Sequence, residues 1–109
     1  MNWKIEFYND KVMHSINKWP SNIRAKFAWV LELLKKDGPN KLGMPHIKQL
    51  GNGLSEIRVK SNEGIARAIF CVLEEKLIII LNEFIKKTQK TPPRELEIAR
   101  KRFKEVKNG

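Results

Sequence analysis

Lysines, an amide and hydroxyl groups crowd together directly after an apolar run in the last third of the chain. The run Leu77–Leu81 is wholly apolar, and three residues later the chain reads Phe84-Ile85-Lys86-Lys87-Thr88-Gln89-Lys90-Thr91-Pro92-Pro93. Like charges held this close together repel one another, so the cluster requires a compensating partner. An anionic ligand at the exit of a buried strand is the simplest such partner.

More cations occur in the preceding hairpin. Arg58 and Lys60 are two residues apart in an alternating segment, which places them on one face of a strand. If the turn at 61–64 has four residues, Arg58 lies opposite Arg67, and Lys60 lies opposite Ile65. Two arginines facing each other are unfavourable, so the pair predicts a phosphate site unless a carboxylate, Glu56 or Glu83, compensates their charge.

A structural interpretation of the same residues remains open. Alternating cations on the open face of a strand are commonly solvated, and Arg67 could be a core arginine paired with Glu56 or Glu83. Among the histidines, His46 is a better candidate than His14, because it belongs to a loop next to the strand that carries Arg58. Lys48 belongs to the same loop.

Several other kinds of site are not indicated. Cys71 stands inside an apolar run and is expected to be a core residue. The cysteine and the histidines lack zinc-ligand spacing, and no phosphate-binding Walker loop, dinucleotide fingerprint or HExxH motif occurs. Gly51-Asn52-Gly53 precedes a strand and therefore indicates a turn. We expect neither a metal nor a cofactor.

Composition indicates a basic folded domain. The 109 residues carry a net charge of +10, while 41% of them are hydrophobic. Such a chain is long enough for a single domain over residues 1–109 with one modest core, and its charge favours nucleic acid or an acidic protein as the partner. No apolar segment suggests a secretion signal or a membrane span, so a cytoplasmic protein without membrane contact is expected.

The pattern of apolar residues predicts the elements that position these groups. It indicates an α+β domain, a small antiparallel sheet with two N-terminal helices and a C-terminal helix packed on it. The strand at 76–84 is apolar on both faces and is expected to be central. The expected elements are a strand at 3–8, helices at 10–18 and 21–36, a loop at 38–53, strands at 54–60, 65–73 and 76–84, and a helix from 93 to 107.

Three motifs together resemble the RelE/ParE toxin superfamily, specifically its phage-derived Gp49-like, HigB-type branch. In that branch a Leu-x-Glu-Leu-Arg strand, an arginine in the next strand and a Phe-x-Lys-Lys-x-Gln-Lys-Thr-Pro exit recur in this order. This chain has Leu54-Ser55-Glu56-Ile57-Arg58, then Arg67, then the segment from Phe84 to Pro92. The resemblance covers nearly the whole chain.

The resemblance implies the toxin of a type II toxin–antitoxin pair, acting as a ribosome-dependent mRNA endonuclease without a metal. The partners it implies are mRNA on the ribosome and a helix-turn-helix antitoxin of the HigA type, with operator DNA contacted only through that antitoxin. By the family pattern, the RNA site lies on the concave face of the sheet. The matching positions are Arg58, Lys60, Arg67, Lys86 and Lys87.

Metal-free RNA cleavage suits these residue types. Arg58 and Arg67 would clamp the phosphate through paired donors, and Lys60, Lys86 and Lys87 would transfer protons or position RNA. His46 is a further acid–base candidate. The expected RNA contacts are Lys48, His46, Phe84 and Lys90.

The chain departs from the family pattern in one respect. Several relatives place a tyrosine or histidine after the last strand, whereas the only tyrosine here is Tyr8. Phe84 could stack on a base but cannot transfer a proton, so the identity of the general acid and base stays open.

Two alternative functions remain. The first is a ParE-like gyrase inhibitor, although such relatives tend to lack the cationic strand cluster. The second is a basic nucleic-acid-binding module without catalytic activity, which would show salt-dependent binding and no cleavage.

Overall fold

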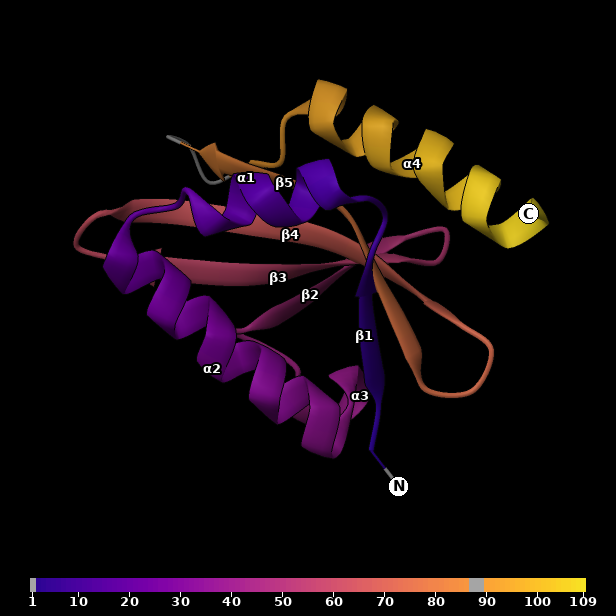
Figure 1. Ribbon diagram of the computed structural model, residues 1–109, viewed down its shortest axis with the longest axis horizontal. Coiled ribbons are helices and arrows are strands. Elements are labelled where there is room, and N and C mark those ends of the chain that lie inside the picture. The colour runs from indigo at the N-terminus through magenta and orange to yellow at the C-terminus, as the bar shows by residue number, and fades with distance from the viewer. Residues whose placement is uncertain (1, 87–89) are drawn as a thin grey trace.

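The computed structural model describes residues 2–86 and 90–109, and within them the chain alternates between short helical and extended segments (Figure 1). The first strand is followed by three helices, then by four strands and a last helix. In chain order the elements are β1 (Lys4–Phe7), α1 (Asp10–Asn17), α2 (Ser21–Asp37), α3 (Pro39–Leu42), β2 (Ile47–Gly51), β3 (Leu54–Ser61), β4 (Gly64–Leu73), β5 (Leu77–Lys86) and α4 (Pro93–Asn108).

The strands form one mixed sheet in the order β1-β5-β4-β3-β2. The α+β class and the helices packed on the sheet are confirmed. The strand expected to be central, β5, is an interior strand between β1 and β4, and β4 occupies the centre. The prediction of an antiparallel sheet is wrong in one place, because β1 pairs parallel to β5, with Tyr8 donating its backbone N–H to Ile80 at 2.8 Å. Alternation of apolar residues is the same for both strand directions, so the sequence pattern could not distinguish them.

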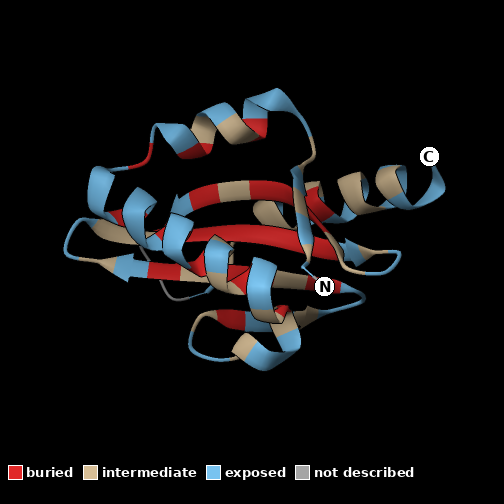
Figure 2. Ribbon diagram, turned by 60° about the horizontal axis from the view of Figure 1, so that its bottom comes forward, coloured by how far each residue is buried: buried red, intermediate tan, exposed pale blue. Residues whose placement is uncertain are grey.

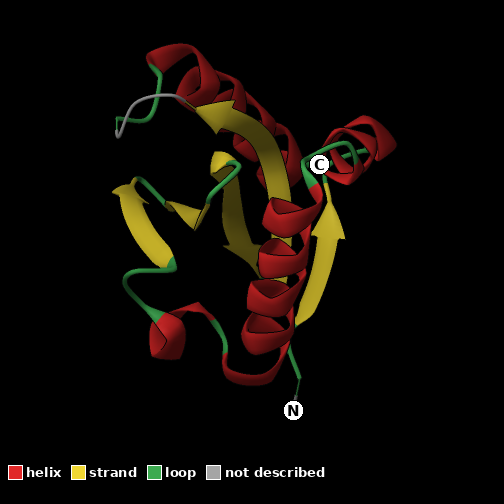
Figure 3. Ribbon diagram, turned by 90° about the vertical axis from the view of Figure 1, so that its left-hand side faces the viewer, coloured by secondary structure: helices red, strands yellow, loops and turns green. Residues whose placement is uncertain are grey.

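The predicted loop at 38–53 holds two elements. The helix α3 and the edge strand β2 both lie within it, and Figure 3 shows α3 leading from the end of α2 into β2. In β2 only Ile47 is buried, opposite Ile57 of β3, so the strand lacks an alternating apolar pattern that could reveal it. The predicted turn at Gly51-Asn52-Gly53 is confirmed by positive φ angles of 90°, 55° and 85°.

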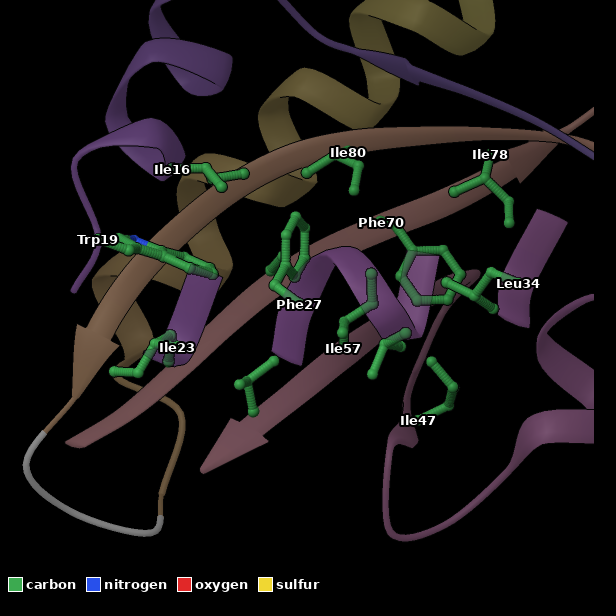
Figure 4. Packing of buried hydrophobic residues seen from close by; sticks show 14 of the residues in the cluster. Ile16, Trp19, Ile23, Phe27, Leu34, Ile47, Ile57, Phe70, Ile78 and Ile80 are labelled. Carbon is green, nitrogen blue, oxygen red and sulfur yellow. The ribbon is translucent and has the colours of Figure 1, made fainter. Parts of the chain in front are cut away.

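The main core lies between the sheet and the pair α1–α2, on what we call the helix-pair face. Figure 2 shows buried residues running along the central strands, and Figure 4 shows α2 side chains packed against them. Helical spacing brings Ile23, Phe27, Val30 and Leu34 onto this face of α2, where all four are buried. The rings of Trp19 and Phe27 meet edge to face at 5.1 Å.

A second, smaller apolar cluster lies under α4, on what we call the α4 face. It contains Leu54, Ile69, Cys71, Ile79, Leu81, Phe84 and Ala99. Two polar contacts fasten the helix: Asn82 Nδ2 donates to the Glu95 backbone oxygen at 3.0 Å, and Arg102 Nη1 donates to the Leu81 backbone oxygen at 2.7 Å. In Figure 1 α4 lies away from the β3–β4 turn, so that end of the α4 face is left uncovered by it.

Helix boundaries follow local chemistry. Asn9 caps α1, because its Oδ1 accepts the Val12 N–H at 2.9 Å. Gly38 ends α2 at a φ of 80°, and a Cβ there would lie 2.6 Å from the Trp3 ring. Thr91 does not cap α4, because its hydroxyl donates to Glu56 instead.

Within the described residues, no helix combines the length and apolar character needed to cross a membrane.

Candidate functional site

The register of the hairpins brings the predicted cations onto the α4 face in two adjacent rows. Arg58 pairs with Arg67, as the turn length predicted, and Arg67 pairs in turn with Phe84 of β5. In the next row Lys60 pairs with Ile65, which pairs with Lys86. Since directly paired residues share one face of a sheet, all four cations belong to the end of the α4 face near the β3–β4 turn.

A buried carboxylate compensates the facing arginines. Glu56 is 1% exposed, and its Oε1 lies 3.3 Å from Arg67 Nη1 and 3.7 Å from Arg58 Nε. Its other oxygen, Oε2, accepts the Thr91 hydroxyl at 2.9 Å. Glu83, the other candidate, pairs with Ala68 and therefore lies on the helix-pair face. Glu56 thus ties both arginines to the segment that precedes α4.

Arg67 is a core arginine paired with Glu56, one of the two possibilities that the sequence left open. Its side chain is 2% exposed, and burial and nearby Arg58 lower its pKa while Glu56 opposes that shift. Its Nε finds no hydrogen-bond partner within the described part of the chain. A buried guanidinium with an unpaired donor is costly, which is consistent with a role beyond packing.

Lys86 is the second buried cation of this end. It is 5% exposed, and its Nζ has no hydrogen-bond partner among residues 2–86 and 90–109. Burial lowers its pKa most, and the charges of Arg67, Arg58 and Lys48 lower it further, against an opposing effect from Glu56. The structure therefore holds the Lys86 amino group at a position where burial and the neighbouring cations disfavour its positive charge.

A pocket of about 220 Å³ opens beside these residues, at the edge of β3 that β2 does not reach. Arg58 N donates to the His46 backbone oxygen at 2.7 Å, where the pairing with β2 ends. Among the described residues, the side chains around the pocket include no carboxylate. They are Lys26, Pro45, His46, Arg58, Val59, Lys60, Ile65 and Arg67. A pocket with this lining favours an anionic ligand.

Some residues around this pocket were not predicted. Lys26 reaches it from α2 and donates its Nζ to the Lys60 backbone oxygen at 2.9 Å. Trp29, one turn further along α2, is 51% exposed and contacts the ring of His46. The signal was present in the sequence, because Trp29 is a large aromatic residue outside the apolar stripe of its helix.

The remaining predicted positions are spread more widely. Phe84 is only 7% exposed and packs in the cluster under α4, so its ring offers little surface to a base. Lys48 is exposed and pairs with Glu56 across β2 and β3. Lys90 is exposed, and Lys87 lies outside the described residues.

Two reactive side chains are placed away from the pocket. The Tyr8 hydroxyl donates to Glu105, which raises its pKa, and Arg102 lies 4.8 Å from the centre of its ring. Tyr8 therefore helps to hold α4. Cys71 is fully buried, and burial raises the pKa of its thiol to about 11, which agrees with the predicted core role and leaves it a poor nucleophile.

Comparisons with known proteins support the resemblance seen in the motifs. The model of the family described as "Phage derived protein Gp49-like" matches residues 14–104. No curated protein sequence matches the chain. Among solved structures, a double arginine-to-alanine mutant of the E. coli toxin RelE in the free state aligns with a TM-score of 0.67 at 17% identity, covering 94% of this chain and 98% of that one. The chain therefore belongs to the phage-derived Gp49-like family, the HigB/RelE-type toxin family, and has the fold of RelE.

Proposed function

We propose that the protein is the toxin of a type II toxin–antitoxin pair and cleaves mRNA on the ribosome without a metal. The observation that carries the proposal lies at the edge of β3 beside the β3–β4 turn, at the end of the α4 face that α4 does not cover. There Arg58, Lys60, Arg67 and His46 surround one pocket that no described carboxylate lines. Family membership and the RelE-like fold agree with this function.

The reaction that this pocket suits is internal transfer of the phosphate. The 2′-oxygen attacks the adjacent phosphorus, its proton passes to a base, and the P–O bond to the 5′-oxygen breaks as an acid protonates that oxygen. The products are a 2′,3′-cyclic phosphate and a 5′-hydroxyl. Negative charge that develops on the phosphorane oxygens requires fixed donors, and guanidinium groups supply them in pairs.

The structure divides the candidate residues by access. In this proposal Arg58, with 22% of its side chain exposed, and Lys60, which is exposed, contact the phosphate in the pocket; their exposure supports this role. Lys60 and His46 are the proton-transfer candidates among the lining residues. Arg67 and Lys86 are buried beneath the exposed cations. In this proposal their positive charge attracts the phosphate and so helps to position the substrate.

The partners proposed for the protein are those that its family membership implies. An antitoxin of the HigA type with a helix-turn-helix would neutralise the protein in the cytoplasm and contact operator DNA. The ribosome would present the mRNA, with exposed Lys48 and Lys90 as additional contacts to its phosphates.

Induction of the protein alone in bacteria, followed by mapping of mRNA 5′ ends, tests the proposal. We expect arrested translation and new 5′ ends inside coding regions, both lost in Arg58→Gln. Intact transcripts would contradict the proposal. DNA damage signalling without mRNA loss would instead support a gyrase inhibitor, and salt-sensitive RNA binding without cleavage would support a binding module.

A further inference from the structure

An exposed aromatic pair stands beside the cationic pocket. Trp29 of α2 is 51% exposed, and its ring centre lies 5.4 Å from that of His46, with the two rings inclined at 82°. In an edge-to-face pair, the ring that offers its edge keeps both of its faces clear of the other ring. The pair therefore leaves flat aromatic surface available to a ligand.

The core does not account for this position of Trp29. The apolar stripe of α2 is complete without it, since Ile23, Phe27, Val30 and Leu34 are buried against the sheet. An indole that is half exposed gains little from burial, and tryptophan is enriched among the residues that contribute most to binding at interfaces.

The pair is continuous with the pocket. His46 lines the pocket, and Lys26, which lies one helical turn before Trp29, lines it from the same helix. Lys26 donates to the Lys60 backbone oxygen, so α2 is fastened to the open edge of β3 at this point. From the segment before β2, the sulfur of exposed Met44 contacts Arg58 Nη1 at 3.9 Å.

We propose that Trp29 and His46 form a stacking platform for one base of single-stranded RNA, while Lys26 and Arg58 hold the flanking phosphates. The inference rests on the proposed function in taking RNA as the ligand, and it adds a base-contacting subsite formed by Trp29 of α2 and by His46, next to the pocket. Aromatic faces beside a positively charged groove are the usual means of binding unpaired bases.

The surroundings favour RNA over a protein partner. The pocket beside the pair is lined by Lys26, Arg58, Lys60 and Arg67, and within residues 2–86 and 90–109 no carboxylate lines it. An aromatic surface next to cations suits the alternation of base and phosphate along a nucleotide strand. The carboxylates of an acidic protein segment would satisfy the cations but offer the rings no flat surface for stacking.

The test uses a short RNA whose 2′-oxygens are methylated, so that binding is measured and cleavage is impossible. At low salt, we expect the RNA to quench the fluorescence of the wild-type protein and Trp29→Ala to weaken binding about tenfold or more. Trp29→Phe keeps an aromatic face and should retain most of the affinity. Because Trp29 is half exposed, the melting temperature of Trp29→Ala should stay close to that of the wild type.

An abasic version of the same RNA sharpens the test. Loss of the bases should weaken binding by the wild type and leave binding by Trp29→Ala almost unchanged, since its stacking surface is already gone. Equal affinity of the wild type and Trp29→Ala for the intact RNA would overturn the inference. So would absence of measurable wild-type binding, or a Trp29→Ala defect confined to binding of a protein antitoxin.

The two proposals fail separately. If the wild type binds methylated RNA through Trp29 but cleaves no mRNA on ribosomes, the endonuclease proposal is wrong and the stacking platform stands. If the wild type cleaves mRNA and Trp29→Ala both binds and cleaves as well as it does, only the platform is wrong.

Discussion

The two ends of the α4 face are formed by the same three strands, β3, β4 and β5, but carry side chains of opposite character, apolar at one end and cationic at the other. At the covered end, under α4, Leu54, Ile69, Cys71 and Leu81 are buried with Ala99 in an apolar cluster. At the open end, near the β3–β4 turn, the corresponding positions are Arg58, Lys60, Arg67 and Lys86. Figure 1 shows the helix beside the first end and away from the second.

The residue between the two ends explains how a small domain can hold an apolar cluster beside a group of cations. Glu56 stands at the junction, buried, and contacts Arg58, Arg67 and Thr91. It balances part of the positive charge at the price of burying a carboxylate. The covered end therefore contributes stability, while the open end contains groups that packing alone does not favour.

The largest expected effect on stability comes from removing the ion pair between Arg67 and Glu56 at the boundary of the two ends. Arg67→Ala removes the buried guanidinium that lies 3.3 Å from Glu56 and leaves that carboxylate buried, so we expect a loss of about 3–5 kcal/mol in the free energy of unfolding. Denaturant titration measures it. The conservative control is Arg67→Lys, which keeps a charge near Glu56 and should lose less. Unchanged stability of Arg67→Ala would show that Glu56 does not depend on this pair.

A matching change at the covered end should separate stability from activity. Leu81 is fully buried, and Leu81→Ala should cost about 2–5 kcal/mol through lost burial and a cavity. RNA cleavage per folded molecule should be unchanged at a temperature where the variant stays folded. Loss of cleavage by well-folded Leu81→Ala would mean that the two ends are not independent.

At the open end, Lys86→Met is expected to have the opposite effect to Leu81→Ala, raising stability while lowering activity. The change removes a buried ammonium group that has no hydrogen-bond partner among the described residues and keeps most of the side-chain volume. We expect a gain of about 1–3 kcal/mol in unfolding free energy, together with weaker cleavage. The control is Lys101→Met on the exposed side of α4, which should alter neither. A destabilised Lys86→Met would show that the ammonium is well satisfied.

The pH dependence of stability gives a smaller and independent signal. The pKa of Lys86 is lower in the folded state than in the unfolded chain, so the unfolded state binds more protons between those two values. Stability contributed by this residue must then rise with pH as the solution passes through the folded-state pKa toward about 10.5. Lys86→Met should remove that rise in a comparison of unfolding curves, whereas a rise of equal size in both proteins would assign it to another group.

Much of this organisation was predictable from the sequence because local patterns encode it. Alternation in β3 and a short turn fixed the pairing of Arg58 with Arg67, and the continuous apolar run of β5 indicated its interior place in the sheet. The edge strand β2 was missed, since one buried residue, Ile47, produces no periodic signal. The parallel pairing of β1 depends on how distant segments meet, which no local pattern records.

Only part of the candidate site was predictable, because local patterns encode the strand cations but not the contacts between distant segments. Cations on the strands were found by their spacing, but their burial depends on the neighbouring strands. Lys26 and Trp29 reach the pocket from α2, and only the packing of that helix against the sheet brings them there. Phe84 was expected to contact a base, and its register opposite Arg67 instead directs it under α4.

The central claim is that the open end of the α4 face cleaves RNA, and the most direct measurement is the rate of mRNA cleavage on purified ribosomes. Arg58→Gln and Lys60→Gln should each slow single-turnover cleavage about 100-fold or more. Both should keep the unfolding free energy within about 1 kcal/mol of the wild type, because the pair between Glu56 and Arg67 stays intact. The exposed α4 variant Lys101→Gln serves as the control and should cleave normally. Cleavage at the wild-type rate by both site variants would contradict the claim.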